Sequence, residues 1–203
     1  ICINNFISFE GFDENIIENT QNISKEEKAF RFITIGRFSY NKGYDLLLKS
    51  FKIFNDTNKQ WKMCIIGSGN SKKEMKYINK NKLNEYVEII YTTDVEKYLE
   101  ESSIYLLPSR YEGMPLAYLE AISKSLPIIC YDIPVMLECT NENALITKKF
   151  DYKQFAKNME ILSNNKLLRK KLGSNSKELS KKYTKENILK KWDKVINELL
   201  NEK

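Results

Sequence analysis

The sequence contains no histidine, and this absence excludes several kinds of catalytic site. Without an imidazole, no Ser–His or Cys–His catalytic unit can form from these residues. No Asp-x-Asp motif is present, and no cysteine or histidine cluster has zinc-ligand spacing. We therefore expect neither a metal site nor a cofactor in this chain.

Cysteine is also scarce. The four cysteines form no Cys-x-x-Cys pair, and Cys64 and Cys130 lie in apolar runs where cysteine behaves as a small hydrophobe. This pattern favours a reducing, cytoplasmic location. No run approaches the ~18 apolar residues of a membrane span. The first residues lack a basic region followed by an apolar stretch, so we expect no signal peptide.

Arginine contributes little to the positive charge. The net charge of +6 comes from 33 basic and 27 acidic residues, and only four of the basic residues are arginine. Two of these, Arg37 and Arg110, lie in predicted loops, and a guanidinium offers a planar fork of donors to a phosphate. Many lysines lie in the last third. A solvated face is their usual explanation, although peripheral association with anionic lipid at the inner face of a membrane stays open. Aromatic residues do not alternate with the lysines, so we expect no nucleic-acid binding.

Apolar strand-like runs alternate with amphipathic helical patterns from Arg31 onward, which is typical of a parallel sheet covered on both faces. We predict an α/β, Rossmann-like fold with about six parallel strands, helices on both faces and further C-terminal helices. The predicted strands are 31–35, 61–66, 86–91, 104–107, 127–131 and 144–147. The predicted helices are 44–54, 72–81, 95–101, 116–125 and 135–139, followed by a helical tail over 155–162, 167–172 and 185–200.

The chain divides into three predicted regions. Residues 1–29 are polar and rich in asparagine, and we interpret them as an interdomain linker that leads into the domain. Residues 30–182 form the predicted Rossmann-like domain. Residues 183–203 form a predicted amphipathic helix, whose apolar positions are Ile188, Trp192, Val195, Ile196, Leu199 and Leu200.

The most informative segment spans residues 107–121 and reads LPSRYEGMPLAYLEA. A buried strand ends at Pro108, a polar loop follows, and a helix is predicted to begin at Pro115, because proline is favoured at the first helical position. The N-terminus of a helix carries partial positive charge and free N–H groups, so this junction suits an anionic ligand. Glu112 precedes the helix and Glu120 lies within it.

A second junction has the same form. The strand over 31–35 leads into Gly36 and Arg37, and then Lys42 and Gly43 precede another helix. Open α/β sheets bind ligands at the carboxyl ends of their strands. Five of the seven glycines fall at such ends or at the next helix start, namely Gly36, Gly43, Gly67, Gly69 and Gly113. Ordinary turn chemistry would account for about half of them.

Gly36–Arg37 with Lys42–Gly43, and Glu112–Gly113–Met114–Pro115 with Glu120–Ala121, together resemble the C-terminal donor-binding domain of retaining GT-B glycosyltransferases of the group 1, family 4-like class. The resemblance covers the chain from about Cys2 to its end. The spacing of Glu112 and Glu120, with seven residues between them, is its most specific part. The resemblance implies a metal-independent transferase that uses a nucleotide sugar, UDP-linked by this resemblance, as a substrate.

The resemblance also implies roles for individual residues. Arg37 and Lys42 would hold the diphosphate, Glu120 the ribose hydroxyls, and Glu112 the transferred sugar, which makes Glu112, Arg37 and Lys42 the catalytic candidates. The implied donor-binding set further includes Gly36, Gly67, Gly69, Tyr91, Ser109, Gly113, Met114, Pro115 and Leu116.

The chain departs from the family pattern in several places. Tyr91 and Ser125 stand where the family often has glycine, and Gly67–Ser68–Gly69–Asn70 replaces a Gly-Asp-Gly-Pro loop. These departures affect the base-binding region more than the two cations and the two glutamates.

Each motif residue also has an ordinary structural explanation. Without the resemblance, Arg37 and Lys42 would be surface cations and Glu112 an acid near a positive helix end. Glu120 would be a solvated residue at the margin of an apolar stripe of Leu116, Leu119 and Leu126.

The resemblance favours a glycan or lipid-linked acceptor, held by an N-terminal domain absent from this chain. If so, some of the apolar face of the last helix would be left exposed. The alternatives are a degenerate, non-catalytic nucleotide-sugar-binding or scaffolding module, and a GT-B nucleotide-sugar epimerase.

Overall fold

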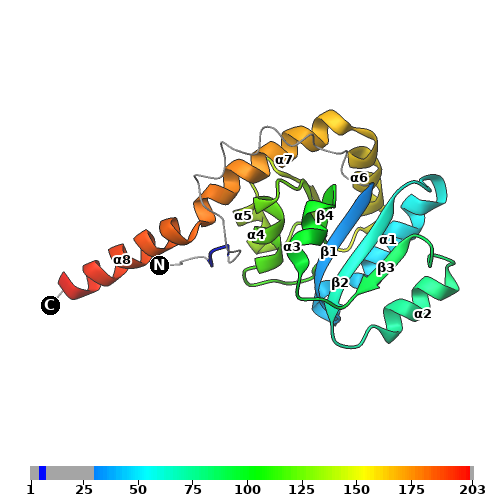
Figure 1. Ribbon diagram of the computed structural model, residues 1–203, viewed down its shortest axis with the longest axis horizontal. Helices are drawn as coiled ribbons and strands as arrows, with labels where there is room; N and C mark the ends of the chain where they lie inside the picture. Colours follow the sequence, from blue (N-terminus) through cyan, green and yellow to red (C-terminus); the bar gives the residue numbers. More distant parts are fainter. Residues whose placement is uncertain (1–4, 8–29, 202–203) are drawn as a thin grey trace.

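The apolar runs of the sequence form parallel strands in the computed structural model, which describes residues 5–7 and 30–201 (Figure 1). The strands are β1 (Arg31–Arg37), β2 (Lys62–Ser68), β3 (Val87–Ile90), β4 (Ile104–Leu107), β5 (Ile128–Tyr131) and β6 (Ala144–Thr147). The helices are α1 (Tyr44–Thr57), α2 (Lys72–Lys80), α3 (Val95–Glu100), α4 (Leu116–Ser123), α5 (Pro134–Cys139), α6 (Tyr152–Asn164), α7 (Lys166–Ser180) and α8 (Lys185–Asn201), with short 3-10 turns η3 (Tyr40–Lys42) and η4 (Lys181–Tyr183).

All six strands belong to one sheet, in the order β3-β2-β1-β4-β5-β6, and every pairing is parallel. The predicted α/β, Rossmann-like fold class is confirmed. Strands are added outward from β1 to β3 on one side of the sheet and outward from β4 to β6 on the other. The direction in which the chain adds strands therefore reverses between β1 and β4. The helices that follow these two strands, α1 and α4, lie on opposite faces of the sheet, and such a reversal point is where open α/β sheets bind ligands.

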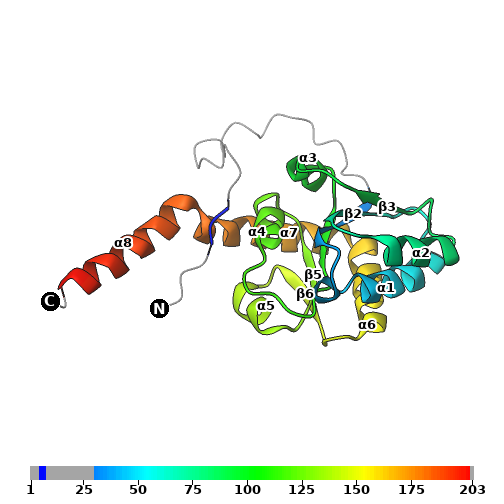
Figure 2. The same cartoon turned by 90° about the horizontal axis from the view of Figure 1, so that it is seen from below.

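Helices cover both faces of the sheet. On one face α1 contacts α2 and α6, and on the other α4 contacts α3 and α7. Figure 2 shows these two groups with the strands between them. Every residue of β4 and β5 is buried, as expected for strands covered on both faces.

An aromatic cluster packs α1 against β1. The ring of Phe32 contacts those of Phe51, Phe54 and Trp61, with centroids 6.4, 5.1 and 4.6 Å apart. These rings anchor α1 to the sheet, and α1 follows directly after the first candidate ligand loop. The core therefore fixes the position at which that loop ends.

Helix α4, which follows β4, differs in detail from its prediction. Helix α4 begins at Leu116, in agreement with its predicted bounds, and Pro115 is its N-cap rather than its first helical residue. Leu116 is 49% exposed, so its assignment to a buried stripe with Leu119 and Leu126 is wrong. The helix ends at Ser123, because Ser125 adopts a left-handed conformation with φ of 60°. A glycine would adopt that conformation without steric cost.

Strand β1 is longer than predicted and includes Gly36 and Arg37. These residues pair in register with Gly67 and Ser68 of β2. Gly36 and Gly67 therefore lie next to one another within the sheet, rather than in the loops beyond it.

The N-terminal described residues contact the chain just before the last helix. The Ile7 N–H donates a 3.0 Å hydrogen bond to the Tyr183 carbonyl, and Ile7 is buried. From this point α8 extends away from the rest of the molecule (Figures 1 and 2). No helix in the described part of the chain is long and apolar enough to cross a membrane. Most of the predicted linker, residues 1–4 and 8–29, lies outside the described residues.

Candidate functional site

The loop after β1 and the loop after β4 pack against each other at the reversal point of the sheet. The Arg110 N–H donates a 2.7 Å hydrogen bond to the Asn41 carbonyl. Gly43 has φ of 68°, and a Cβ atom at this position would lie 2.1 Å from the Pro108 carbonyl oxygen. Only glycine tolerates this conformation together with so close a backbone. Gly43 thus allows the two loops to meet.

The predicted catalytic pair lies at this contact. The Lys42 Nζ donates to Oε1 of Glu112 over 2.6 Å, and the Ser109 hydroxyl donates to the same oxygen over 2.6 Å. The Lys42 side chain is 25% exposed and that of Glu112 is 12% exposed. One carboxylate oxygen therefore receives both donors, and the structure brings Lys42, Ser109 and Glu112 together.

Beneath this pair the loops are supported by buried tyrosines. The Tyr44 hydroxyl donates a 3.0 Å hydrogen bond to the Gly36 carbonyl. Burial raises the pKa of Tyr44, so this hydroxyl stays protonated and remains a donor. Tyr44, Tyr105, Lys42 and Glu112 are among the residues that line a cavity of about 10 Å³, about the smallest space that holds one water molecule.

Arg37 ends β1 at the same edge of the sheet. It is exposed, and no ion pair joins it to another described residue. A Cβ atom on Gly69 would lie 3.8 Å from the Arg37 Cγ, so the loop after β2 borders this side chain. An exposed guanidinium at the end of β1 is available to an anionic ligand.

Aromatic residues form the next part of this edge. The Phe38 ring lies 5.3 Å from that of Tyr44 and 6.0 Å from that of Tyr91, measured between centroids. Phe38 also fills the space next to Gly67, where a Cβ atom would lie 2.4 Å from its ring. The Tyr91 hydroxyl donates to the Ser71 hydroxyl over 2.6 Å, which leaves a 59% exposed aromatic residue at the end of β3.

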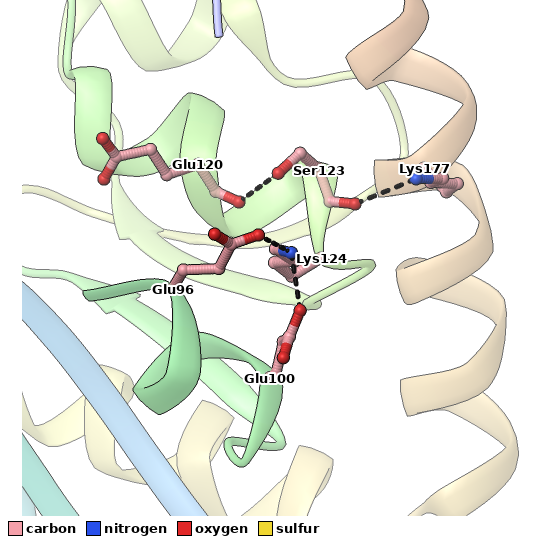
Figure 3. A network of polar contacts seen from close by, with 6 residues as sticks. All are labelled: Glu96, Glu100, Glu120, Ser123, Lys124 and Lys177. Atoms are coloured by element: carbon pink, nitrogen blue, oxygen red, sulfur yellow. Dashed lines mark hydrogen bonds and ion pairs between the residues drawn. The ribbon is translucent and has the colours of Figure 1, made fainter. Parts of the chain in front are cut away.

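Glu120 lies in the second turn of α4, and Figure 3 shows its side chain extending away from the ionic contacts of Lys124. Burial raises the pKa of the Glu120 carboxyl above its usual value. Because α4 begins at the end of β4, which neighbours β1, the start of the helix that carries Glu120 lies at the edge of the sheet where Arg37 ends β1.

Lys124, one helical turn after Glu120, connects α4 to α3 (Figure 3). It forms ion pairs with Glu96 and, over 2.6 Å, with Glu100. Lys177 of α7 donates to the Ser123 carbonyl over 3.1 Å at the end of α4. The helix that carries Glu120 is therefore fixed from both neighbouring helices.

Arg110 lies in the same loop but is not available for a phosphate. Its guanidinium forms two hydrogen bonds with the Asp45 carboxylate, 2.8 and 2.7 Å long, and a third with the Tyr40 carbonyl. Burial opposes the ionisation of Asp45, but these hydrogen bonds lower the pKa of its carboxyl. The fork of donors that made Arg110 notable in the sequence serves an internal contact.

The remaining predicted residues in the α4 loop have different surroundings. Gly113 is exposed, and a Cβ atom on it would meet nothing within 4 Å. The Met114 sulfur lies 3.9 Å from the Cys139 sulfur, so this side chain points toward α5. Pro115 is buried and Leu116 is exposed. Gly113 and Leu116 thus border open space, whereas the Met114 and Pro115 side chains support the loop.

The sequence interpretation missed Asp45, Phe38 and Tyr44. Asp45 lies in the first turn of α1, where acidic residues are common, so its position in the sequence is not a signal. Its partner Arg110 stood out only because arginine is scarce in this chain. Phe38 and Tyr44 looked like ordinary aromatic residues. Their contacts depend on chain segments that are distant in sequence.

A larger depression, of about 280 Å³, lies elsewhere. It is lined by residues near α7, η4 and the turn before β6, which are Asn141, Glu142, Asn175, Glu178, Leu179, Lys181, Lys182 and Asn187. It lies away from the carboxyl ends of the strands. Among the described residues, no group of three histidine, cysteine or acidic side chains could hold a metal ion. The chemistry available at the β1–β4 edge is anion binding by Arg37 and Lys42 next to two carboxylates.

The sequence is similar to those of known glycosyltransferases. An uncharacterized glycosyltransferase of Haemophilus influenzae is 29% identical over 199 residues, which cover 95% of this chain and 55% of that protein. The amylovoran biosynthesis glycosyltransferase AmsD of Erwinia amylovora is 30% identical over 84% of this chain and 49% of its own length. The chain therefore spans about half the length of these curated relatives.

Solved structures show the same fold. A crystal structure of a Staphylococcus aureus TarM variant, in complex with fondaparinux, α-GlcNAc-glycerol and UDP, superposes with a TM-score of 0.83 at 26% identity. The match covers 97% of this chain and 39% of that one. The family model for glycosyl transferases group 1 matches residues 15–179, which include both ligand loops and all six strands. On this evidence the chain belongs to the glycosyl transferases group 1, of the GT-B type.

Proposed function

We propose that this chain is the donor-binding domain of a retaining, metal-independent glycosyltransferase. The donor is a nucleotide sugar, with UDP as its nucleotide, and the acceptor is a hydroxyl group of a polysaccharide or glycolipid. The nucleotide sugar is a substrate, and no cofactor takes part. The UDP bound in the related TarM complex and the amylovoran biosynthesis role of AmsD support this choice of donor and acceptor class.

Arg37 and Lys42 hold the diphosphate in this proposal. During transfer the bond between the anomeric carbon and the phosphate oxygen breaks, and its electron pair leaves with UDP. Two cations beside the departing diphosphate stabilise the charge that develops there. The acceptor oxygen then bonds to the anomeric carbon on the same face and passes its proton to the departing diphosphate oxygen.

The two glutamates hold the other parts of the donor. Glu120 accepts hydrogen bonds from the ribose hydroxyls, for which an ionised carboxylate offers two oxygens. Glu112 contacts a hydroxyl of the transferred sugar and stabilises the positive charge on the sugar ring as the bond breaks. The sugar and the backbone of the loop meet at Gly113, where the structure leaves open space.

A single observation carries the proposal. Lys42 and Glu112, 70 residues apart in sequence, lie 2.6 Å apart at the reversal point of the sheet, in a chain of the glycosyl transferases group 1. The exposed Arg37 and the half-buried Glu120 border the same edge. The Glu112 carboxylate is only 12% exposed and is paired with a cation at the ends of two central strands. Such a pair is unusual for an ordinary solvated surface, where charged residues are mostly exposed.

In this proposal the acceptor is bound by a second domain of the same polypeptide, N-terminal to this one. In α8, Leu189, Trp192, Ile196, Leu199 and Leu200 are between 46% and 65% exposed. Soluble proteins rarely expose so continuous an apolar face. The Ile7 backbone contact brings the preceding chain to the base of this helix. A domain that precedes residue 1 is the proposed cover for the face.

Isothermal titration calorimetry with UDP tests the donor assignment. We expect the chain to bind UDP, and Arg37→Ala and Glu120→Ala to weaken binding about tenfold or more, because each removes a charge-assisted contact. Arg31→Ala is the matched control, since Arg31 forms a 3.0 Å ion pair with Glu101 at the opposite edge of the sheet. Equal heats for the parent and both site variants would reject the assignment.

A further inference from the structure

The guanidinium of Arg110 is enclosed by groups from the opposite loop. Its Nη1 and Nη2 atoms donate to the two carboxylate oxygens of Asp45 over 2.8 and 2.7 Å. Nη1 also donates to the Tyr40 carbonyl over 2.8 Å, and the guanidinium carbon lies 4.1 Å from the centroid of the Tyr40 ring. The Phe150 ring lies 5.8 Å away, and the Arg110 side chain is 10% exposed.

These contacts connect the two loops next to their functional residues. Arg110 precedes Glu112 by two positions, and its backbone N–H donates to the carbonyl of Asn41, which immediately precedes Lys42. Arg110 therefore contacts the η3 turn through both its backbone and its side chain. Asp45 lies three residues after Lys42, at the start of α1, so the contacts enclose Lys42 from both sides in sequence.

Direct phosphate binding by Arg110 is disfavoured by the same geometry. A bidentate Arg–carboxylate pair uses the fork of donors that would otherwise meet a phosphate. The aromatic ring of Tyr40 covers a face of the guanidinium, which is the usual arrangement of a cation–π contact. A ligand would have to displace Asp45, which the first turn of α1 holds in place.

We propose that Arg110 is a positioning residue that fixes the η3 turn against the loop of Glu112 and so holds Lys42 ready for the diphosphate. Asp45 is its partner in this role. The contact orders the cation before the ligand arrives, which reduces the conformational entropy lost on binding. This inference rests on the proposed function for its ligand, but not for the order that it imposes on the loops.

The experiment compares Arg110→Ala, Arg110→Lys, Asp45→Ala and the Arg110→Ala/Asp45→Ala double variant with the parent, and Arg31→Ala serves as the control. Calorimetry gives the affinities for UDP and UMP, which differ by the outer phosphate. Hydrogen exchange of the backbone amides in the η3 turn reports the order of the loop without any ligand. Thermal melts show whether each variant is folded.

We expect Arg110→Ala to weaken UDP binding about tenfold, and to weaken UMP binding less, because a displaced cation loses the outer phosphate. Arg110→Lys should not restore affinity, since an ammonium cannot replace the bidentate fork. The double variant should lose no more than either single variant, because both remove one contact. Amides of the η3 turn should exchange faster in all four variants and at the parental rate in the control.

Three affinity results would overturn the proposal. They are an unchanged UDP affinity in Arg110→Ala, an equal loss of affinity for UDP and UMP in that variant, and a double variant whose loss of affinity is the sum of the two single losses. Parental exchange rates in the η3 turn would also overturn it. If the parent binds neither nucleotide, the proposed function fails. The exchange rates then decide alone whether Arg110 orders this turn.

Discussion

The Nζ atom of Lys42 and the Ser109 hydroxyl both donate to the same oxygen of Glu112, each over 2.6 Å. The cation assigned to the diphosphate is thus already paired with the carboxylate assigned to the sugar. A bound diphosphate would compete with Glu112 for Lys42. This competition gives the two residues opposite effects on the binding of UDP, which lacks the sugar.

Glu112→Gln is expected to increase UDP affinity about threefold, because it removes a negative charge beside the diphosphate and releases Lys42. Lys42→Ala should weaken UDP binding about tenfold, because it removes the cation itself. Titration calorimetry measures both effects, and Glu101→Gln at the opposite edge of the sheet is the control. Weaker UDP binding by Glu112→Gln than by the parent would contradict the competition between carboxylate and diphosphate.

Gly43 and Gly113 should respond differently to substitution by alanine. At Gly43 the new Cβ would lie 2.1 Å from the Pro108 carbonyl oxygen on a backbone with φ of 68°, so Gly43→Ala should lower the free energy of unfolding by about 2–4 kcal/mol. At Gly113 nothing lies within 4 Å, so stability should change by less than about 0.5 kcal/mol. Urea denaturation measures both.

The same pair separates stability from ligand binding. If the open space at Gly113 is occupied by the donor sugar, Gly113→Ala should weaken binding of a UDP-sugar while it leaves UDP binding nearly unchanged. A Gly43→Ala variant as stable as the parent would show that the two loops separate easily. That result would also count against a fixed Lys42–Glu112 geometry.

The sheet could be predicted from the sequence because each strand is a short apolar run bounded by polar residues. Apolar strand-like runs alternate with helical patterns along the sequence, and this alternation indicated a parallel sheet. The positions of the two candidate ligand loops followed from where β1 and β4 end. The ends of elements were less certain. Ser125 adopts a left-handed conformation that its residue type does not signal, and helix α4 therefore stops earlier than its pattern suggested.

The site was predictable in its cations and carboxylates but not in its supporting contacts. Glu112 and Lys42 were identified by a motif, and their roles as donor ligands stay predictions. The Arg110–Asp45 pair could not be predicted, because it joins residues 65 positions apart, and only the packing of two loops brings them together. Leu116 fits an apolar stripe by spacing, yet it lies exposed at the first position of its helix.

Lys124 should control how α3 is held next to the helix of Glu120. Lys124→Met keeps much of the side-chain length but removes the cation that separates Glu96 from Glu100, leaving two carboxylates one turn apart. Like charges at this spacing repel each other on a helix. We expect a loss of about 1–2 kcal/mol in unfolding free energy and faster amide exchange in α3.

A double variant tests whether that repulsion is the cause. Adding Glu96→Gln to Lys124→Met should restore part of the lost stability, because a single carboxylate then remains without its partner. No recovery, or equal exchange rates in α3 for the parent and Lys124→Met, would show that α3 is held by its apolar contacts alone.

Glu120→Gln should make the ligand-free chain more stable at neutral pH. Burial raises the pKa of the Glu120 carboxyl, so between its unfolded and folded pKa values the folded state binds more protons than the unfolded state. Stability therefore decreases as pH rises through this interval, and the charged carboxylate destabilises the folded state above it. An uncharged glutamine avoids this cost.

Thermal melts from pH 4 to pH 8 measure the difference between Glu120→Gln and the parent. The melting temperature of the variant should exceed that of the parent at the upper end of this range, and the difference should shrink toward the acidic end as Glu120 itself becomes neutral. Glu160→Gln, at an exposed position of α6, is the control.

Glu120→Gln should also weaken UDP binding about tenfold, because an amide provides only one acceptor oxygen for the ribose hydroxyls. A variant that is less stable than the parent at neutral pH would mean that the carboxylate of Glu120 already has a stabilising partner in the folded chain, and Glu120 would then not be held free for a ligand.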